Sequence, residues 1–516
     1  MNPDKTGYDV IVVGGGHNGL VSASYLAKAG KKVLLLEGTD HLGGATTSVK
    51  PFPDFDAKLS RYSYLVSLLP DKIVSDLAIN FKTLERPYAS FTPYRKGDVD
   101  SGLLVANKWN DETEKSFKEL TGSDAEGKAW QNFYGEIADF AKRFAPTMLE
   151  PLRTRSELRN HMNLERTWEY LIERPIGEVI NERFSNDIVR GVVLTDAIIG
   201  TFVSAEQIQA NICFLYHLIG NGTGQWRVPQ GGMGAIVVEL ERVARGAGVE
   251  IQVGSRVSDI ETSATGVSVT TEGKQRFVAQ QLLFAGAPQT LDKIRGRKPV
   301  GSLEGSQLKI NMLLSSLPQL KSGVDPRKAF AGTFHANESF SQLENAVKEV
   351  RNGKLPELLP LEMYCHTLTD PSILSGELID KGFQTLTLFG IHTSASLFDA
   401  DNEGTKEVAK QLALSSLNQF LAQPIEDVLA RNSDGSLAIE VKSPTDLEAD
   451  IGLPRGNIFH RDLDFPFKED GEQLQWGAET DDPRIFLAGA GARRGGGVSG
   501  IAGHNAAMAA LNSPNL

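Results

Sequence analysis

The chain has 516 residues, 41% of them hydrophobic, and a net charge of −12. This length exceeds what one hydrophobic core normally holds, so we expect two or more lobes, and the acidic balance disfavours a nucleic-acid partner. The two cysteines form no CxxC pattern and the histidines are scattered, which predicts a reducing compartment and no metal site. A polar start and the lack of an 18-residue apolar run predict a cytoplasmic protein without a membrane span.

The chain opens with a strand, a glycine-rich turn, a helix and a second strand. The predicted strands cover 8–13 and 32–36, and helical spacing of apolar residues covers 20–29. The turn consists of Gly14, Gly15, Gly16, His17, Asn18 and Gly19. In such a unit the glycines allow the tight turn, the approach of a pyrophosphate and close packing of helix on strand. The helix N-terminus favours the same anion, so the turn predicts a dinucleotide site.

An acidic residue and a second glycine pair follow the second strand. Glu37 lies 23 positions after Gly14, near the usual offset of about 20 for the carboxylate that binds a ribose. A carboxylate there would repel a 2′-phosphate. The next residues of interest are Gly38, Gly43, Gly44 and Ala45. This arrangement resembles flavoproteins of the glutathione-reductase-like superfamily, in which the chain returns past the pyrophosphate. The resemblance implies FAD as the cofactor.

The middle of the chain contains helical and strand-like patterns. Amphipathic spacing predicts helices at 111–120, 125–144, 179–190, 204–218 and 235–247. A strand at 249–253 precedes a small meander at 257–260, 266–271 and 275–278, and an apolar strand follows at 282–286. Alternating segments at 306–314, 361–368 and 384–392 predict a mixed sheet over the flavin face.

The C-terminal segment repeats the order of strand, glycine turn and helix. The strand begins at Arg484 and the helix covers 501–511. The turn between them contains Gly491, Gly495, Gly496, Gly497 and Val498. Helix N–H groups at this place would face the flavin and stabilise negative charge on the reduced ring. Arg493 and Arg494 either face the flavin as well or form a solvated surface pair.

Four segments, in order along the chain, resemble the phytoene desaturase/carotenoid isomerase superfamily. They cover 14–21, 60–69, 226–234 and 495–500. The resemblance is greater to the phytoene dehydrogenase-related branch named after pyridine nucleotide-disulfide oxidoreductase domain-containing protein 2. Ala45 replaces the arginine usual in carotene desaturases, which weakens a carotenoid assignment. Arg493 and Arg494 replace the usual His-Pro.

The resemblance implies an α/β fold with a glutathione-reductase-like FAD-binding Rossmann domain and a second, mixed α+β substrate domain. The FAD-binding lobe would comprise 1–75, 226–294 and 456–516, and the substrate lobe 76–225 and 295–455. In related flavoproteins the valine that matches Val257 binds the adenine edge through its backbone.

The catalytic residues are harder to identify than the cofactor. Similar proteins place the segment of Arg61 and Tyr62 against the flavin. Arg61 would stabilise a developing carbanion or enolate, or else form a structural ion pair, and Tyr62 would donate a proton or form an aromatic wall. Trp226 and Met233 are candidates for the substrate pocket. His366 is an acid–base candidate or a core histidine.

These observations predict an FAD-dependent oxidoreductase that removes hydride from a C–H bond of a mainly apolar substrate, giving a desaturated product and reduced FAD. A redox-neutral, flavin-dependent isomerase and an amine oxidase are enzymatic alternatives. A binding protein like the GDP-dissociation inhibitors is the non-enzymatic one, which Glu37 and the two glycine turns disfavour. The expected partners are a small lipophilic substrate, taken from a bilayer surface or a carrier, and no nucleic acid. The electron acceptor and the oligomeric state stay open.

Overall fold

The computed structural model describes residues 5–299 and 304–514. Seven strands of this part of the chain form a first sheet around β1 (Lys5–Val13), which lies parallel to β12 (Arg276–Phe284) and to β2 (Val33–Leu36). The sheet continues through β9 (Glu250–Gln252) on one side and through β18 (Ile485–Leu487), which pairs with β12, on the other. Helix α1 (His17–Lys28) connects β1 to β2, so the predicted strand–helix–strand unit is confirmed.

Both faces of β1 are covered, which explains its continuous apolar sequence. Val10 and Val12 pack with residues of α1, α10 (Gly234–Gly246) and α17 (Ile501–Leu511). Ile11 and Val13 pack on the opposite face with residues of the neighbouring antiparallel strands and of α11 (Pro288–Ile294). Successive side chains of a strand point to opposite faces, so a strand covered on both sides must be apolar throughout.

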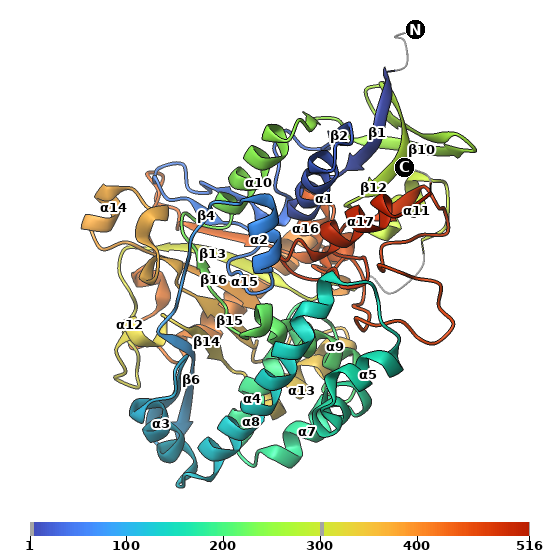
Figure 1. The fold of residues 1–516 in the computed structure, drawn as a ribbon. Helices are drawn as coiled ribbons and strands as arrows, with labels where there is room; N and C mark the ends of the chain where they lie inside the picture. The colour runs from blue at the N-terminus through green and yellow to red at the C-terminus, as the bar shows by residue number, and fades with distance from the viewer. Residues whose placement is uncertain (1–4, 300–303, 515–516) are drawn as a thin grey trace.

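Two glycines set how closely the helices approach one another and the strand. A Cβ atom on Gly19 would lie 1.9 Å from the carbonyl oxygen of Gly14, and one on Gly503 would lie 2.1 Å from that of Asn18. The first glycine lets α1 pack against the turn after β1, and the second lets α17 pack against α1. This contact brings the first and last helices of the chain into one layer (Figure 1).

The meander is confirmed, but its last strand is longer than predicted. β10 (Val257–Ser263) and β11 (Gly266–Thr271) pair antiparallel, and β11 pairs with the first part of β12. The segments expected at 275–278 and 282–286 are one strand of nine residues. Gln280 and Gln281 interrupt the apolar pattern between them, yet Gln281 is fully buried opposite Val10. Backbone pairing with β1 therefore continues the strand where the side-chain pattern suggests a break.

The second sheet also contains seven strands of the described residues, in the order β17-β13-β16-β15-β14-β6-β7. The predicted mixed sheet is confirmed by β13 (Leu308–Leu314), β15 (Leu361–Tyr364) and β16 (Gln384–Gly390). The remaining strands are β14 (Thr333–Ala336), β17 (Ile439–Lys442) and the hairpin of β6 (Tyr88–Lys96) and β7 (Val99–Ala106). The hairpin was not predicted, because the sequence analysis named only helices, the first at 111–120, between residues 76 and 225.

A layer of helices completes the second lobe and lies away from the first sheet (Figure 1). The predictions for α3 (Asp111–Thr121), α4 (Ala125–Phe144) and α9 (Ile208–Ile219) are confirmed. The single helix predicted at 179–190 is wrong. The chain forms α7 (Ile176–Arg183) and α8 (Asp187–Ile198), with Phe184 in an extended conformation between them. The side chain of Asn186 caps α8 by accepting hydrogen bonds from two backbone nitrogens, and this cap starts the new helix.

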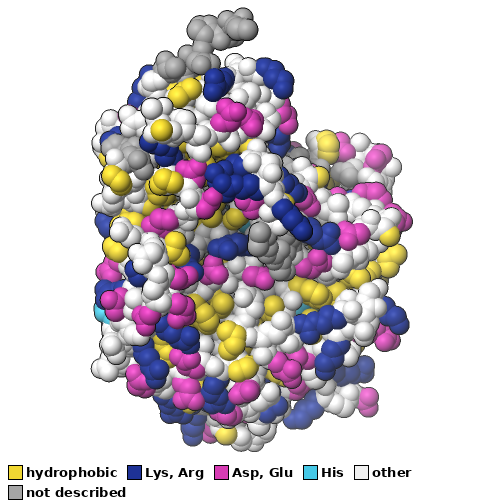
Figure 2. Space-filling view, turned by 90° about the vertical axis from the view of Figure 1, so that its right-hand side faces the viewer, with side chains coloured by type: hydrophobic (Ala, Val, Ile, Leu, Met, Phe, Trp, Pro, Cys, Tyr) yellow, Lys and Arg dark blue, Asp and Glu magenta, His cyan; other side chains and the backbone are white. Residues whose placement is uncertain are grey.

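Short elements connect the lobes and cover their edges. The helices are α2 (Asp71–Leu77), α5 (Arg155–Met162), α6 (Glu165–Trp168), α12 (Pro326–Ala329), α13 (Phe340–Arg351), α14 (Gly376–Asp380), α15 (Asn402–Asn418) and α16 (Pro444–Ile451). The strands are β3 (Ser48–Val49), β4 (Leu59–Ser60), β5 (Thr83–Leu84) and β8 (Val228–Pro229). No helix of the described residues is long and apolar enough to cross a membrane. On the face shown in Figure 2, basic and acidic side chains are interspersed.

Candidate active site

The glycine turn after β1 forms an open cradle. Gly14 has a φ of +105°, which gives the sharp exit from the strand, and Gly16 precedes the first turn of α1. A Cβ atom on Gly16 would meet only the carbonyl oxygen of Gly43, at 4.0 Å, so the space beside Gly16 is empty of protein. Gly14, Gly16, His17, Asn18 and Gly19 all line one cavity. The turn thus has the shape that a pyrophosphate at the N-terminus of α1 requires.

The chain returns to this turn after the second strand. Gly16 and Gly43 form a parallel backbone bridge, and the backbone nitrogen of Gly43 donates to the oxygen of Gly15 at 3.0 Å. Gly43 and Gly44 have φ values of +123° and +52°, which favour glycine. Gly44 and Ala45 line the cavity, whereas Gly43 and Gly15 lie behind them. The predicted second pass beside the pyrophosphate site is therefore present.

Glu37 lies at the edge of the same cradle. Its Oε2 accepts a 2.6 Å hydrogen bond from the backbone nitrogen of Gly15, and its Oε1 accepts from the backbone nitrogen and the hydroxyl of Thr39. Glu37, Gly38 and Val257 line the cavity. The carboxylate is thus held in place at the position where the sequence analysis expects the adenosine ribose.

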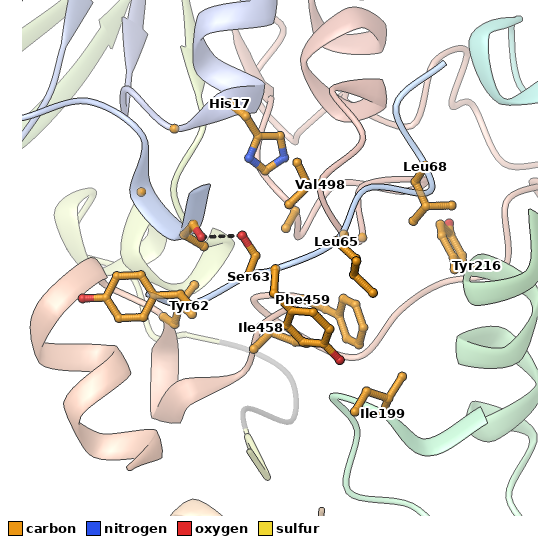
Figure 3. A pocket seen from close by; sticks show the side chains of 18 of the residues that line it. His17, Tyr62, Ser63, Leu65, Leu68, Ile199, Tyr216, Ile458, Phe459 and Val498 are labelled. Atoms are coloured by element: carbon orange, nitrogen blue, oxygen red, sulfur yellow. Dashed lines mark hydrogen bonds between the residues drawn. The ribbon is translucent and has the colours of Figure 1, made fainter. Parts of the chain in front are cut away.

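The C-terminal turn closes the cradle from the other side. Gly497 and Val498 line the cavity, and Gly500 precedes α17 with a φ of +70°. Gly491 is not a lining residue; it packs against Pro288 and His460. Figure 3 shows His17 beside Val498 on one side of the cavity, with Ile199 on the opposite side. The two glycine turns, far apart in the sequence, thus face one space.

Two buried histidines line this part of the cavity. Burial lowers the pKa of His17 to about 4, against a smaller raising effect of the Gly497 backbone, and burial also lowers the pKa of His460 to about 4. Among the described residues, the Nε2 atom of His17 and the Nδ1 atom of His460 have no hydrogen-bond partner. Buried polar atoms normally have a hydrogen-bond partner, so these two nitrogens are available to a polar ligand. With the open cradle and Glu37, they fit a bound FAD.

The cavity continues from the cradle into the second lobe, with a volume of about 680 Å³ in all. Its inner wall comes from α4, α8, α9 and the residues next to them, and it is largely apolar. The wall residues include Trp130, Ile137, Ala138, Val192, Ile199 and Leu218. Leu65, Ile458 and Phe459 narrow the passage between the two parts (Figure 3). A ligand in the inner part would therefore meet mainly hydrocarbon and aromatic surface.

Lys309 interrupts the apolar wall with a buried amino group. Its Nζ lies 4.9 Å from the ring centre of Tyr64 and 4.3 Å from that of Phe389, and it donates to the Thr387 hydroxyl. Burial lowers the pKa of Lys309 to about 7, which the nearby Glu440 and Glu362 only partly offset. Burial thus favours the uncharged amine, which suits proton exchange.

Two histidines with carboxylate partners line the inner cavity. Nδ1 of His335 lies 2.7 Å from Oε2 of Glu338, and Nε2 of His217 lies 3.2 Å from Oδ1 of Asp196. The hydroxyl of Thr195 also donates to Glu338. Burial lowers the pKa of His335, but the charge and hydrogen bond of Glu338, together with the charges of Glu362 and Asp196, outweigh burial, and the net shift is upward. A carboxylate that holds one ring nitrogen leaves the other available for a ligand.

The structure separates the two predicted catalytic residues. Arg61 is not among the described residues that line the cavity; its guanidinium forms an ion pair with Glu440. Tyr62 does line the cavity, but its hydroxyl donates to Oδ2 of Asp450 at 3.0 Å. Burial and the Asp450 charge raise the pKa of Tyr62, which suits an aromatic wall better than a proton donor.

The other predicted residues fall into two groups. Trp226 lines the cavity, while Met233 is fully buried in the core beneath α10. His366 is buried, and its Nε2 lies 3.2 Å from Oδ2 of Asp370, which also accepts a hydrogen bond from the backbone nitrogen of Gly231. His366 is therefore a core histidine.

Both readings of the Arg493–Arg494 pair are wrong for Arg494. It is 1% exposed, is absent from the described cavity lining, and donates to the carbonyl oxygens of Thr147, Glu150 and Trp476. Arg493 forms an ion pair with Glu472. Neither side chain therefore faces the flavin site or stands free on the surface as part of a solvated pair.

Several residues of the cavity were not predicted. Lys309 carries a signal that could have been used, because a lysine inside the apolar strand Leu308–Leu314 requires a special partner. The others carry no local signal: they are Arg86, Asp196, His217, His335, Glu362 and His460. They come from separate elements that only the fold brings together.

Comparisons with known proteins agree with this site. Residues 12–71 match the family model described as an NAD(P)-binding Rossmann-like domain, and residues 94–311 match flavin containing amine oxidoreductase. An uncharacterized protein of Mycobacterium tuberculosis is 43% identical over 99% of this chain and 98% of its own length. Pyridine nucleotide-disulfide oxidoreductase domain-containing protein 2 of Rattus norvegicus is 27% identical over 98% of this chain and 93% of its own.

More distant similarities extend the comparison. The all-trans-retinol 13,14-reductase of Danio rerio is 24% identical over 93% of this chain and 82% of its own. A putrescine oxidase structure, 18% identical over 99% of both chains, has a TM-score of 0.60 and shows the shared fold. FAD is accordingly the cofactor, and the protein is an oxidoreductase. Together the two glycine turns, the cavity between the lobes and these relatives show that the chain belongs to the superfamily of FAD-dependent flavin oxidoreductases.

Proposed function

We propose that this enzyme removes a hydride from a C–H bond of a mainly apolar substrate and so introduces a double bond. One observation carries the proposal: the dinucleotide cradle opens directly into an inner cavity walled by apolar and aromatic residues of α4, α8 and α9. The retinol reductase named above acts, by its name, on a lipophilic polyene, which supports the same class of substrate. FAD, when bound, accepts the hydride.

The residues of the chain position the reactants. Glu37 and the two glycine turns would hold the dinucleotide. The hydroxyl of Ser63 donates to the carbonyl oxygen of Ala45 at 2.7 Å, which ties the segment of Tyr62 to the returning chain (Figure 3). Leu65, Ile458 and Phe459 exclude water from the passage. Pre-formed orientation and exclusion of water are the main contributions a flavoprotein makes to hydride transfer.

Loss of a hydride leaves a proton on the adjacent carbon, and His335 is placed to take it. Glu338 holds Nδ1 of His335, so Nε2 is the atom left to accept the proton. The charge of Glu338 favours the protonated ring and raises the pKa of His335. The product is then the alkene, and His335 would hold the proton.

Anaerobic reduction of the flavin tests the proposal. Purified holoenzyme is mixed, without oxygen, with apolar compounds that have allylic C–H bonds and, separately, with primary and secondary amines. We expect the flavin absorbance to bleach with apolar compounds and not with amines. Bleaching by amines only would overturn the proposal.

Two alternatives differ in the same experiment. Amine oxidation is supported by the family model over residues 94–311 and predicts bleaching by amines. A redox-neutral isomerase needs prereduced flavin and yields a product of unchanged mass without net bleaching. The proposal also includes an electron acceptor that reoxidises FAD and peripheral contact with a membrane during substrate uptake. Both can be measured with the purified holoenzyme.

A further inference from the structure

Arg86 lines the inner cavity, and no described residue forms an ion pair with it. Its side chain is buried, with 6% of the residue exposed. Nε donates to the carbonyl oxygen of Trp226 at 3.3 Å, and Nη1 donates to the Thr333 hydroxyl at 3.1 Å. The guanidinium lies 5.3 Å from the ring centre of Tyr364. These contacts fix the group, but all three partners are neutral.

Other buried arginines of this chain are compensated differently. Arg295, also well buried, forms ion pairs with Asp481 and Asp482. Arg494 is surrounded by three backbone carbonyls and does not line the cavity. Within the described part of the chain, Arg86 forms no ion pair with a carboxylate oxygen inside 4.0 Å. A buried guanidinium that faces a cavity without a counter-ion is a site for an anion.

The carboxylates nearest in charge to Arg86 are engaged by other groups. Glu440 is paired with Arg61, and Glu338 with His335, so their charges are taken up. Glu362 accepts from the hydroxyl of Tyr64 and acts on Arg86 and Lys309 only at longer range. Arg86 and Lys309, whose positive charge burial disfavours, thus share the charge of Glu362. Burial lowers the pKa of Arg86 despite Glu362, as expected for a charge that is not fully compensated.

Two neutral groups near the same wall also lack partners. Nε1 of Trp226 and the side-chain amide of Gln307 are buried, line the cavity and have no hydrogen-bond partner among the described residues. The backbone of Trp226 already contacts Arg86. A pure hydrocarbon would leave all these donors unsatisfied, and leaving buried donors unpaired is costly.

We propose that the substrate is amphipathic and that Arg86 binds its anionic head group, a carboxylate or a phosphate, inside the cavity. The planar guanidinium still has Nη2 to offer, and its fork matches the oxygens of either group. The apolar wall of α4, α8 and α9 then receives the hydrocarbon chain. This inference deepens the proposed function and rests on it for the redox role of the site.

Equilibrium binding to the holoenzyme tests the head group without turnover. The probes share a twelve-carbon chain: dodecanoate, dodecyl phosphate, methyl dodecanoate, dodecanol and dodecylamine. Binding is followed by calorimetry and by perturbation of the flavin absorbance spectrum. We expect dodecanoate or dodecyl phosphate to bind at least tenfold more tightly than the ester and the alcohol. The ranking of the two anions identifies the head group.

Three variants locate the effect. Arg86→Met should abolish the preference for the anion, and Arg86→Lys should retain part of it because the charge stays and the fork is lost. Arg245→Met, on the exposed face of α10, is the matched control and should behave as wild type. Flavin content reports folding. If Arg86→Met loses its flavin, the inference is tested by two other results. These are the anion preference of the wild type and a weaker anion preference in Arg86→Lys.

Each result has a defined consequence. Equal binding of dodecanoate, dodecyl phosphate and methyl dodecanoate overturns the inference, as does an anion preference that persists in Arg86→Met or tighter binding of dodecylamine. Flavin reduction is scored separately. Bleaching by neutral apolar compounds without an anion preference would overturn the inference and leave the proposed function intact. Arg86-dependent anion binding without bleaching by any apolar compound would support the anion site and overturn the proposed function.

Discussion

Glu37 accepts a 2.6 Å hydrogen bond from the backbone nitrogen of Gly15, so the carboxylate expected to bind a ribose also holds the glycine turn. Its second oxygen is held by Thr39. Glu37 therefore pre-organises the cradle, whose shape depends on a side chain 22 positions away from the turn. Such pre-organisation reduces the ordering cost of binding.

Replacement of Glu37 should weaken FAD binding twice over. Glu37→Ala removes the ribose acceptor and releases the turn, and we expect a loss of about 1.5–3 kcal/mol, or roughly 10- to 100-fold in Kd. Titration of the apoprotein with FAD, followed by flavin fluorescence, measures it. Glu37→Gln, which keeps one acceptor for Gly15, should lose less. Unchanged affinity in Glu37→Ala would mean that the carboxylate does not reach the ribose.

A methyl group on Gly16 should block FAD without harming the fold. The Cβ position is clear of protein to 4.0 Å and points into the cradle, so the apoprotein of Gly16→Ala should melt like wild type. Overpacking against the pyrophosphate should cost about 1–3 kcal/mol of FAD affinity. Gly246→Ala, at another open position, is the control. Gly19→Ala should instead lower the melting temperature of the apoprotein, because the added Cβ would clash with the carbonyl oxygen of Gly14.

Arg494 should act on stability rather than on the flavin. Arg494→Met leaves the carbonyl oxygens of Thr147, Glu150 and Trp476 without their donor, and we expect a loss of about 2–4 kcal/mol in the free energy of unfolding. Thermal melting of the holoenzyme detects it as a lower Tm. The exposed Arg245→Met should change little. A shifted flavin redox potential with unchanged Tm would contradict this assignment.

Stability should fall as the pH drops from 6.5 to 4. His17 and His460 are neutral in the folded protein, with pKa values of about 4, but bind protons near 6.5 when unfolded. The unfolded state therefore takes up more protons in this window, and each group costs up to about 1.4 kcal/mol per pH unit. His17→Asn should flatten the dependence of Tm on pH, whereas the exposed His161→Asn should not. An equal slope in His17→Asn and wild type would refute the role of His17.

The sequence by itself determined the parts whose signal is local. The strand, turn and helix of β1 and α1, and the helix α17, follow from apolar spacing and glycine positions within a few residues. The FAD site could be predicted for the same reason, since the glycine turns and Glu37 lie at short, regular spacings. The hairpin of β6 and β7 and the break between α7 and α8 could not, because partners elsewhere in the chain and a cap decide them.

Only the tertiary structure decided what the inner cavity contains. Arg86, Trp226 and Thr333 come from three distant segments and are joined by hydrogen bonds of Arg86. Lys309 lies near the rings of Tyr64 and Phe389, which come from two further segments. Arg494 is buried and donates to three backbone carbonyl oxygens. The residues next to it in the sequence give no indication of these partners. Local periodicity records which face of an element is apolar, but burial and pairing of a charge depend on which elements pack around it.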